Sequence, residues 1–268
     1  MYDLYFSNIL SGVAEAAYEQ QIGLVISPTQ HEHSREASLL DRLRHGATDG
    51  TLIILPEQSS EELLRLLDGP YPFVVVDPLL ALDRRIPCVA ADHRFGAEQV
   101  MRHLLALGHR RIAAITGPPG WVATEERRSV YRAALANAGI ERDPALEVEA
   151  DYQFEPGAVA AASLLELPVP PTAIFAFNDS IAIGAMDAAS VRDVRVPEDL
   201  SVVGFDDLTY ATVVTPGLTT VRQPLAEMGR AAVELLLRLL EPSHSGPMQL
   251  ELPTRLVVRG STGPPEAR

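Results

Sequence analysis

Lysine is missing from the 268-residue sequence, cysteine occurs once, and each of these absences excludes a class of protein. All 22 basic residues are therefore arginines, and they face 36 Asp and Glu residues, which gives a formal net charge of −14. A chain this acidic is expected to bind polyanions such as DNA poorly. Because Cys88 is the one cysteine, the sequence has neither a disulfide framework nor a cysteine zinc cluster.

Long apolar runs are missing as well. Hydrophobic residues make up 47% of the sequence, which is typical of a globular domain, and no run reaches the roughly 18 apolar residues of a membrane span. Residues 1–10 also lack the basic start and the apolar core of a signal peptide. We therefore expect a cytoplasmic protein without a membrane partner.

Short apolar runs alternate with segments of helical spacing. The apolar residues Ile9, Leu10, Val13 and Ala17, for example, share one helix face. This alternation predicts an α/β fold of doubly wound parallel sheets, and at this length two such lobes are more natural than one wide sheet. Runs that are apolar on both faces predict central parallel strands at 22–26, 51–55, 73–76, 111–115, 172–177 and 201–205.

Helix caps support this alternation. Ser59 and Glu62 have the spacing of a capping box at a helix start. Gly108 and Gly139 stand where helices are expected to end, and Pro224 suits a first helical turn. The boundaries of four segments are therefore predicted independently of the apolar pattern.

A search for catalytic, metal and cofactor motifs finds none. The sequence has no nucleophile elbow, zinc-binding HExxH, phosphate loop or dinucleotide fingerprint. The segment 117–120 (GPPG) lacks the lysine and spacing of a phosphate loop and is interpreted as a strand–helix turn. His31 and His33 lie two apart in an expected loop, and Cys88 lies in an apolar run that favours an inert, buried thiol. We expect no catalytic residue, no metal and no cofactor.

Polar side chains recur directly after predicted strands. Each one alone is better explained as a helix N-cap or turn residue. Together they predict a polar ligand cleft, because open α/β sheets bind ligands at the carboxyl ends of their strands. Carboxylates and an amide suit a hydroxyl-rich, sugar-like ligand. The residues concerned are Asp77, Asp92, Asn178, Asp179, Asp206 and Asp207.

Several segments, in this order, resemble the effector-binding core of the LacI/GalR family of bacterial transcriptional regulators. They are YFSNILSGV (5–13), LGHRRI (107–112), GPP (117–119) with ERRSVYR (126–132), PTAIF (171–175) with ND (178–179), VPEDLSVVGFDD (196–207) and LTTVRQP (218–224). The resemblance runs over nearly the whole chain. It implies a fold similar to periplasmic sugar-binding proteins, with two α/β lobes joined by three crossovers and the effector between them. The lobes would comprise residues 1–92 plus 223–252 and residues 93–222 plus 253–268.

The resemblance also implies which residues contact the effector. Arg127 matches a helix arginine that reaches an effector hydroxyl or carboxylate, although an arginine on an exposed helix face is the alternative. Phe6 and Tyr152 match aromatic contacts, with ordinary core packing as the alternative. Trp121 suits sugar stacking but matches no family position. The complete predicted ligand-binding set is Tyr5, Phe6, Asp77, Arg127, Tyr152, Asn178, Asp206 and Gln223.

The resemblance implies the sensing and dimerising part of a regulator. We expect a homodimer that binds a carbohydrate or related polar metabolite. The family's helix-turn-helix and first core strand are not found in these 268 residues, so operator DNA is expected to be contacted only through a helix-turn-helix outside them.

Two other functions fit the sequence less well. A sugar-binding protein of an uptake system is disfavoured because no signal peptide is found and because the VVGFDD and LTTVRQP segments resemble regulators. An enzyme using Asp206 and Asp207 as acid and base is disfavoured because adjacent side chains usually point apart.

Overall fold

The chain folds into two compact units, each built from more than one stretch of sequence. The structure is a computed structural model and describes residues 4–29, 32–43, 48–69, 71–241 and 248–266. The first unit comprises Met1–Ala91 with Pro224–Leu252, and the second comprises Asp92–Gln223 with Pro253–Arg268. The chain therefore passes between the units at three places.

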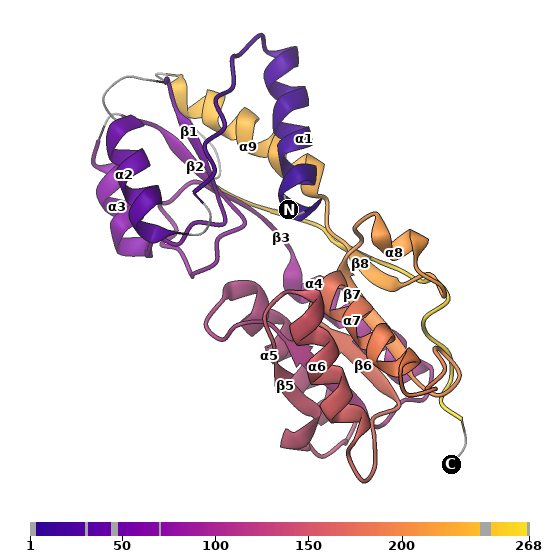
Figure 1. Cartoon of the computed structure of the whole chain (residues 1–268). Coiled ribbons are helices and arrows are strands. Elements are labelled where there is room, and N and C mark those ends of the chain that lie inside the picture. Colours follow the sequence, from indigo (N-terminus) through magenta and orange to yellow (C-terminus); the bar gives the residue numbers. More distant parts are fainter. Residues whose placement is uncertain (1–3, 30–31, 44–47, 70, 242–247, 267–268) are drawn as a thin grey trace. The chain divides into compact units, whose positions relative to one another are not determined.

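The second unit is built on a six-stranded sheet (Figure 1). Its strand order is β10 (Arg255–Val257), β8 (Thr219–Arg222), β7 (Ser201–Asp206), β6 (Ala173–Ala176), β4 (Ile112–Thr116) and β5 (Glu147–Glu149). All neighbours are parallel except β10, which pairs antiparallel with β8. The carboxyl ends of five strands therefore lie at one edge of the sheet.

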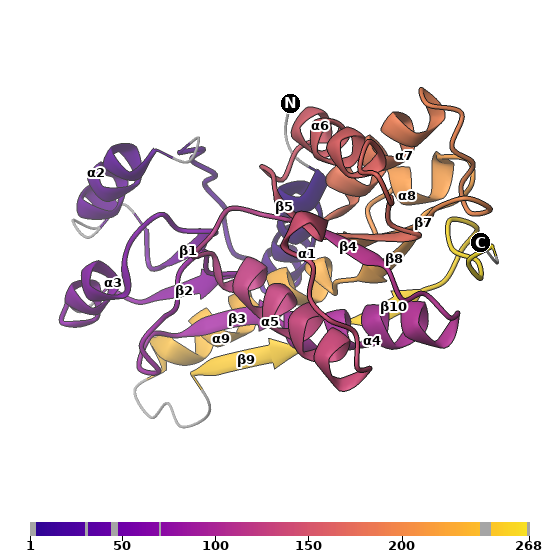
Figure 2. The ribbon, with the colours of Figure 1, turned by 90° about the horizontal axis from the view of Figure 1, so that it is seen from below.

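Helices cover both faces of this sheet. Helices α4 (His93–Ala106) and α5 (Val122–Asn137) pack against each other on one face (Figure 2), and α6 (Phe154–Leu165) and α7 (Asp179–Ser190) do so on the other. Alternate residues of a strand point to opposite faces of the sheet and pack into the hydrophobic core on each face. Phe175 packs with α4 and α5, and Ile174 packs with α6 and α7. Both faces of the strands are thus buried, as the doubly apolar runs predict. The short α8 (Tyr210–Val213) and a 3₁₀ turn, η1 (Pro144–Leu146), complete the unit.

The first unit has a four-stranded parallel sheet. Its order is β1 (Thr51–Ile54), β2 (Phe73–Val76), β3 (Cys88–Ala91) and β9 (Gln249–Leu252). The helices are α1 (Leu4–Glu19), α2 (His33–Leu43), α3 (Ser60–Leu67) and α9 (Leu225–Leu240). Helices α1 and α9 touch backbone to backbone, since a Cβ at Gly12 would lie 1.8 Å from the carbonyl oxygen of Ala226. The predicted capping box at Ser59 and Glu62 is present at the start of α3.

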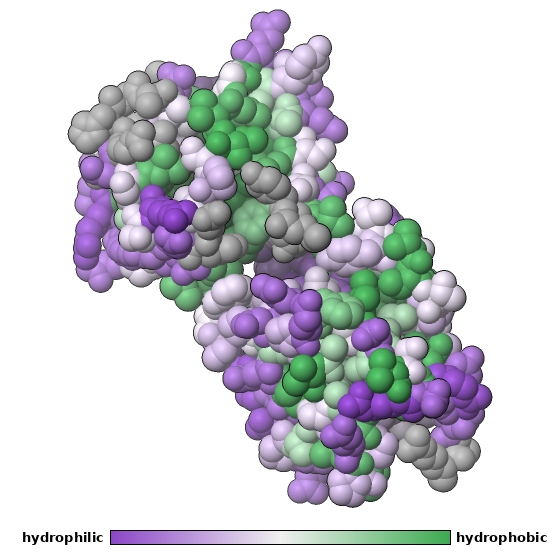
Figure 3. Space-filling view, in the orientation of Figure 1, coloured by the Kyte–Doolittle hydropathy of each residue, from purple (hydrophilic) through white to green (hydrophobic). Residues whose placement is uncertain are grey.

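The predicted strand at 22–26 is wrong. This segment carries no strand, and its apolar side chains are exposed, from 39% at Ile22 to 78% at Val25. Figure 3 shows apolar surface on the first unit. A strand exists only where a neighbouring strand takes its N–H and C=O groups, and no described residue pairs with this segment in either sheet. The other five predicted strands are confirmed as β1, β2, β4, β6 and β7.

Candidate functional site

Arg127 lies on the inner face of α5 and is buried. Only 3% of its surface is exposed. Its Nη1 donates to the carbonyl of Phe177, its Nη2 lies 3.2 Å from Nδ1 of His93, and its guanidinium carbon lies 3.7 Å from the ring centre of Phe205. The last contact is a cation–π interaction. The exposed-helix alternative for Arg127 is therefore wrong.

The surroundings of Arg127 contain acceptors but no counter-charge. Among the described residues it makes no ion pair, and its buried Nε has no hydrogen-bond partner in the protein. Buried polar groups are normally hydrogen-bonded, and a buried cation held only by neutral groups is costly. The Nε–H of Arg127 is therefore a donor that could bind an oxygen atom of a ligand.

Asp206 and Gln223 form a second polar pair, where β7 and β8 end. Gln223 Nε2 donates to Asp206 Oδ1 at 2.7 Å, and both residues are buried. The amide oxygen of Gln223 is buried, and it has no hydrogen-bond partner among the described residues. Asp206 has a φ of +122°, a backbone conformation that costs free energy in a residue with a side chain. Strain of this kind concentrates at ligand-binding sites.

Asp207 has a different role from its neighbour. Its carboxylate is buried and forms two ion pairs, with Arg222 and Arg259, each at 2.5 Å. The two adjacent aspartates therefore have separate partners. This arrangement does not favour the acid–base pair that an enzyme would need, because both carboxyl oxygens of Asp207 are engaged by arginines.

Asn178 and Tyr152 lie together beside the end of β6. Asn178 caps α7, since its Oδ1 accepts from the Ile181 N–H at 2.8 Å, and its Nδ2 donates to the Tyr152 carbonyl at 3.2 Å. The Tyr152 hydroxyl is hydrogen-bonded to Thr124 at 2.8 Å, and its ring lies 5.7 Å from that of Trp121. The N-cap alternative for Asn178 is confirmed. Trp121 is only half-buried, so the two aromatic rings form a partly exposed surface.

The first unit contributes three predicted residues. The Tyr5 hydroxyl donates to Asp77 Oδ2 at 2.5 Å, and the rings of Tyr5 and Phe6 meet edge to face at 6.4 Å. Asp77 follows β2 with a φ of +52° and is buried. Tyr5, at the start of α1, and Asp77, at the carboxyl end of β2, are therefore brought together within this unit.

Arg127 makes no hydrogen bond to another predicted residue, but it contacts the residues that immediately precede two of them. Phe177, its carbonyl partner, immediately precedes Asn178, and Phe205, beneath the guanidinium, immediately precedes Asp206. Sequence reasoning missed His93 entirely. The available signal was its position directly after Asp92, which caps α4 at the end of β3.

The cysteine and the other possible metal ligands do not indicate a reactive thiol or a metal site. Burial raises the pKa of the Cys88 thiol to about 12, which leaves it protonated and unreactive. No group of three metal-binding side chains is found among the described residues. His31 lies outside them, but His33, which was expected in the same loop, is the first residue of α2, so the loop interpretation is wrong for His33. Its Nε2 lies 2.9 Å from Oε1 of Glu62. None of the helices in the described ranges combines the length and apolar character needed to cross a membrane.

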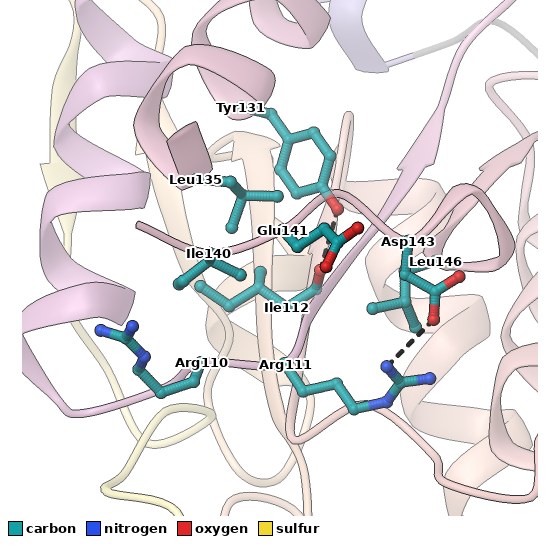
Figure 4. A pocket seen from close by; sticks show the side chains of 9 residues that line it. All are labelled: Arg110, Arg111, Ile112, Tyr131, Leu135, Ile140, Glu141, Asp143 and Leu146. Carbon is teal, nitrogen blue, oxygen red and sulfur yellow. Dashed lines mark hydrogen bonds and ion pairs between the residues drawn. The ribbon is translucent and has the colours of Figure 1, made fainter. Parts of the chain in front are cut away.

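A small cavity of about 140 Å³ opens at the opposite end of β4 (Figure 4). Its lining is apolar around Ile112 and Leu135, and the Tyr131 hydroxyl donates there to the Ile112 carbonyl at 2.9 Å. The Arg111–Asp143 ion pair, at 3.0 Å, stands at its rim. None of the predicted ligand-binding residues lines it. It lies at the amino end of the sheet, where open α/β sheets do not usually bind ligands.

Comparison with known proteins identifies the family. Residues 101–262 match the model of a periplasmic binding protein-like domain. The chain is 34% identical over 263 residues to the HTH-type transcriptional repressor CytR of Escherichia coli K12, covering 97% of this chain and 76% of that protein. A regulatory protein of the LacI family from Chloroflexus aggregans has a similar structure, with a TM-score of 0.87, 30% identity and coverage of 96% of this chain and 92% of the other. The chain belongs to the LacI family of transcriptional regulators.

A solved complex extends this likeness to a ligand-bound relative. The LacI-family core described here superimposes on the transcriptional regulator CelR in its cellobiose complex with a TM-score of 0.87, 33% identity and coverage of 96% of this chain and 79% of that chain. The α/β fold and family expected from the sequence are thereby confirmed. The regulators among the relatives favour regulation over the transport alternative.

Proposed function

We propose that this LacI-family core senses a small hydroxyl-rich effector, a carbohydrate in the first place, and that effector binding alters operator binding by the regulator. The buried amide oxygen of Gln223 carries this proposal, because it lies next to the carboxylate of Asp206 and has no hydrogen-bond partner in the described part of the chain. Two neighbouring hydroxyls of a ligand can donate, one to that oxygen and the other to the carboxylate. Cellobiose in the CelR complex is one such polyhydroxyl ligand.

The predicted residues have complementary roles in this proposal. Arg127 offers its unpartnered Nε–H to an effector oxygen, whereas Asp206 and Gln223 accept from hydroxyls. Asn178 presents an amide, and Tyr152 with Trp121 presents ring faces for a sugar to stack on. Tyr5, Phe6 and Asp77, which lie together within the first unit, are the other predicted effector contacts.

The two units, with boundaries near residues 92, 222 and 252, act as the two lobes of the effector-binding core. An effector favours one arrangement of the lobes only by the difference between its affinities for the two arrangements. The regulator works as a cytoplasmic homodimer without catalytic activity and contacts operator DNA through a helix-turn-helix outside these residues. The repressor and regulator names of the relatives support this assignment.

Thermal unfolding in the presence of candidate effectors tests the proposal. The panel contains cellobiose first, then monosaccharides, other disaccharides, sugar phosphates, polyols and purines. A ligand at about 100 times its dissociation constant stabilises the folded state by about 2.7 kcal/mol, which raises Tm by a few degrees. We expect one carbohydrate to raise Tm selectively.

Matched variants separate a specific site from general stabilisation. Arg127→Ala is expected to abolish the Tm shift, whereas Arg102→Ala, an exposed arginine on α4, is expected to retain it. An absence of any shift across the panel with a cooperative wild-type transition would contradict the carbohydrate assignment. An equal shift in all three proteins would contradict the site.

A further inference from the structure

His93 is an unexpected neighbour for an arginine. It is the first residue of α4, directly after the cap Asp92, whose carboxylate accepts from the Phe95 N–H at 2.7 Å. Only 3% of the His93 surface is exposed, and its ring centre lies 6.1 Å from that of Phe205. The same Phe205 ring lies beneath the guanidinium of Arg127. The cap therefore fixes where the helix begins, and the helix start places the imidazole against the arginine.

The 3.2 Å contact between Arg127 Nη2 and His93 Nδ1 is a hydrogen bond in only one protonation state and tautomer of the imidazole. A guanidinium group has five N–H donors and no acceptor, so the contact is a hydrogen bond only when Nδ1 carries a lone pair. A neutral imidazole with Nδ1 as the acceptor carries its proton on Nε2. A doubly protonated ring would turn an N–H toward the guanidinium and place two cations together.

Three contacts hold the guanidinium in place. The Phe177 carbonyl accepts from Nη1, His93 Nδ1 accepts from Nη2, and the Phe205 ring packs against the guanidinium face. Of the three guanidinium nitrogens, Nε is the one that these contacts leave without a partner among the described residues. The direction in which Arg127 presents that donor therefore depends on the two acceptors that hold its other end.

We propose that His93 is a positioning residue for Arg127: as the neutral tautomer protonated on Nε2, it locks the guanidinium so that Nε–H is presented to the effector. The part played by the effector rests on the proposed function. The lock itself is a property of the protein without ligand. It explains how a buried arginine without an ion pair in the described residues keeps one orientation.

Two substitutions of similar size separate hydrogen bonding from packing. His93→Asn places a carbonyl oxygen where Nδ1 was and keeps an acceptor, whereas His93→Leu has nearly the same shape and no acceptor. Both are checked first by thermal unfolding, which reports whether each variant is folded. If His93 only fills space, the two variants behave alike.

The test observes the arginine directly, by NMR of the ligand-free protein labelled at its arginine side chains. The Arg127 signals are assigned as those lost in Arg127→Lys. We expect separate, slowly exchanging Nη signals in the wild type and in His93→Asn, and loss of that separation in His93→Leu. Spectra of labelled histidine at about pH 8, above the range in which histidines usually protonate, should show the His93 proton on Nε2.

Either of two results would overturn the proposal. One is Nη signals of Arg127 that are equally well separated in His93→Leu and His93→Asn. The other is a His93 ring with its proton on Nδ1. Because no sugar is added, these spectra do not change if the panel of effectors gives no Tm shift. Failure of the proposed function and failure of this inference are therefore distinguishable.

Discussion

The side-chain amide of Gln223 donates to the carboxylate of Asp206 at 2.7 Å, and this bond joins the ends of the adjacent strands β7 and β8. Both side chains are buried, so the bond sets which way the amide points and leaves its oxygen without a partner among the residues that the structure describes. This relationship underlies both the stability of the strand ends and the proposed effector site.

Gln223→Glu should therefore be destabilising in a pH-dependent way. It replaces a hydrogen bond with two buried carboxylates in contact, and we expect the free energy of unfolding at about pH 8 to fall by about 2–3 kcal/mol. Protonation of one carboxyl restores the bond, so the loss should shrink as the pH falls. Urea unfolding at several pH values measures this. Gln153→Glu, at an exposed residue, is the control, and an equal effect of the two substitutions would contradict the prediction.

Asp179 should make the protein less stable as the pH rises through the neutral range. Burial raises the pKa of this carboxyl to about 7, although Thr220 and the Leu208 N–H donate to it. In the unfolded chain it titrates near 3.8, so between these values the folded protein holds a proton that the unfolded chain lacks. The stability that Asp179 contributes is thus present at low pH and is lost as the pH rises toward 7.

Asp179→Asn removes this titration. Between about pH 5 and pH 8, the free energy of unfolding of the wild type should fall relative to that of the variant. Burial lowers the pKa of His109, which acts with the opposite sign, but that effect is common to both proteins and cancels in the difference. Asp187→Asn, on the exposed face of α7, should leave the wild-type slope unchanged. Parallel curves for wild type and Asp179→Asn would refute the assignment.

Tyr5→Phe should destabilise the first unit by about 1–2 kcal/mol, because it removes a hydrogen bond to a buried carboxylate. Tyr18→Phe on the same helix is the matched control, since Tyr18 is 86% exposed and its hydroxyl stays in water. Denaturant unfolding compares the two. Equal stabilities for both variants would show that the bond to Asp77 contributes nothing.

The fold could be predicted wherever the burial of a strand follows from its own residues. β2 and β6 are apolar on both faces and are buried on both. The segment 22–26 has the same composition and forms no strand, because a strand also needs a hydrogen-bonding neighbour that its own residues do not specify. β5 and β9 were not among the predicted runs because they are edge strands with polar, partly exposed residues.

The site could be predicted only in part for a related reason. Acidic and amide residues after strands carry a positional signal, so Asp206 and Asn178 could be proposed from the sequence. The burial of Arg127 could not be predicted from the sequence, because its neighbours Glu126 and Arg128 suggest an exposed helix face. Its acceptors are Phe177, directly after β6, and His93 of α4, and both are distant in sequence. His93 was missed because one histidine after a strand has no distinctive spacing.

The most direct test of the central claim is a calorimetric titration of cellobiose, and then of each carbohydrate that raises Tm, into the wild type, Asp206→Asn and Arg102→Ala. Asp206→Asn keeps the size of the side chain but replaces an acceptor oxygen with donor hydrogens. We predict saturable binding of one carbohydrate to the wild type and to Arg102→Ala, and a loss of affinity of at least about tenfold in Asp206→Asn, equivalent to about 1.4 kcal/mol. Equal affinity in all three proteins, or no carbohydrate binding to the wild type, would contradict the account.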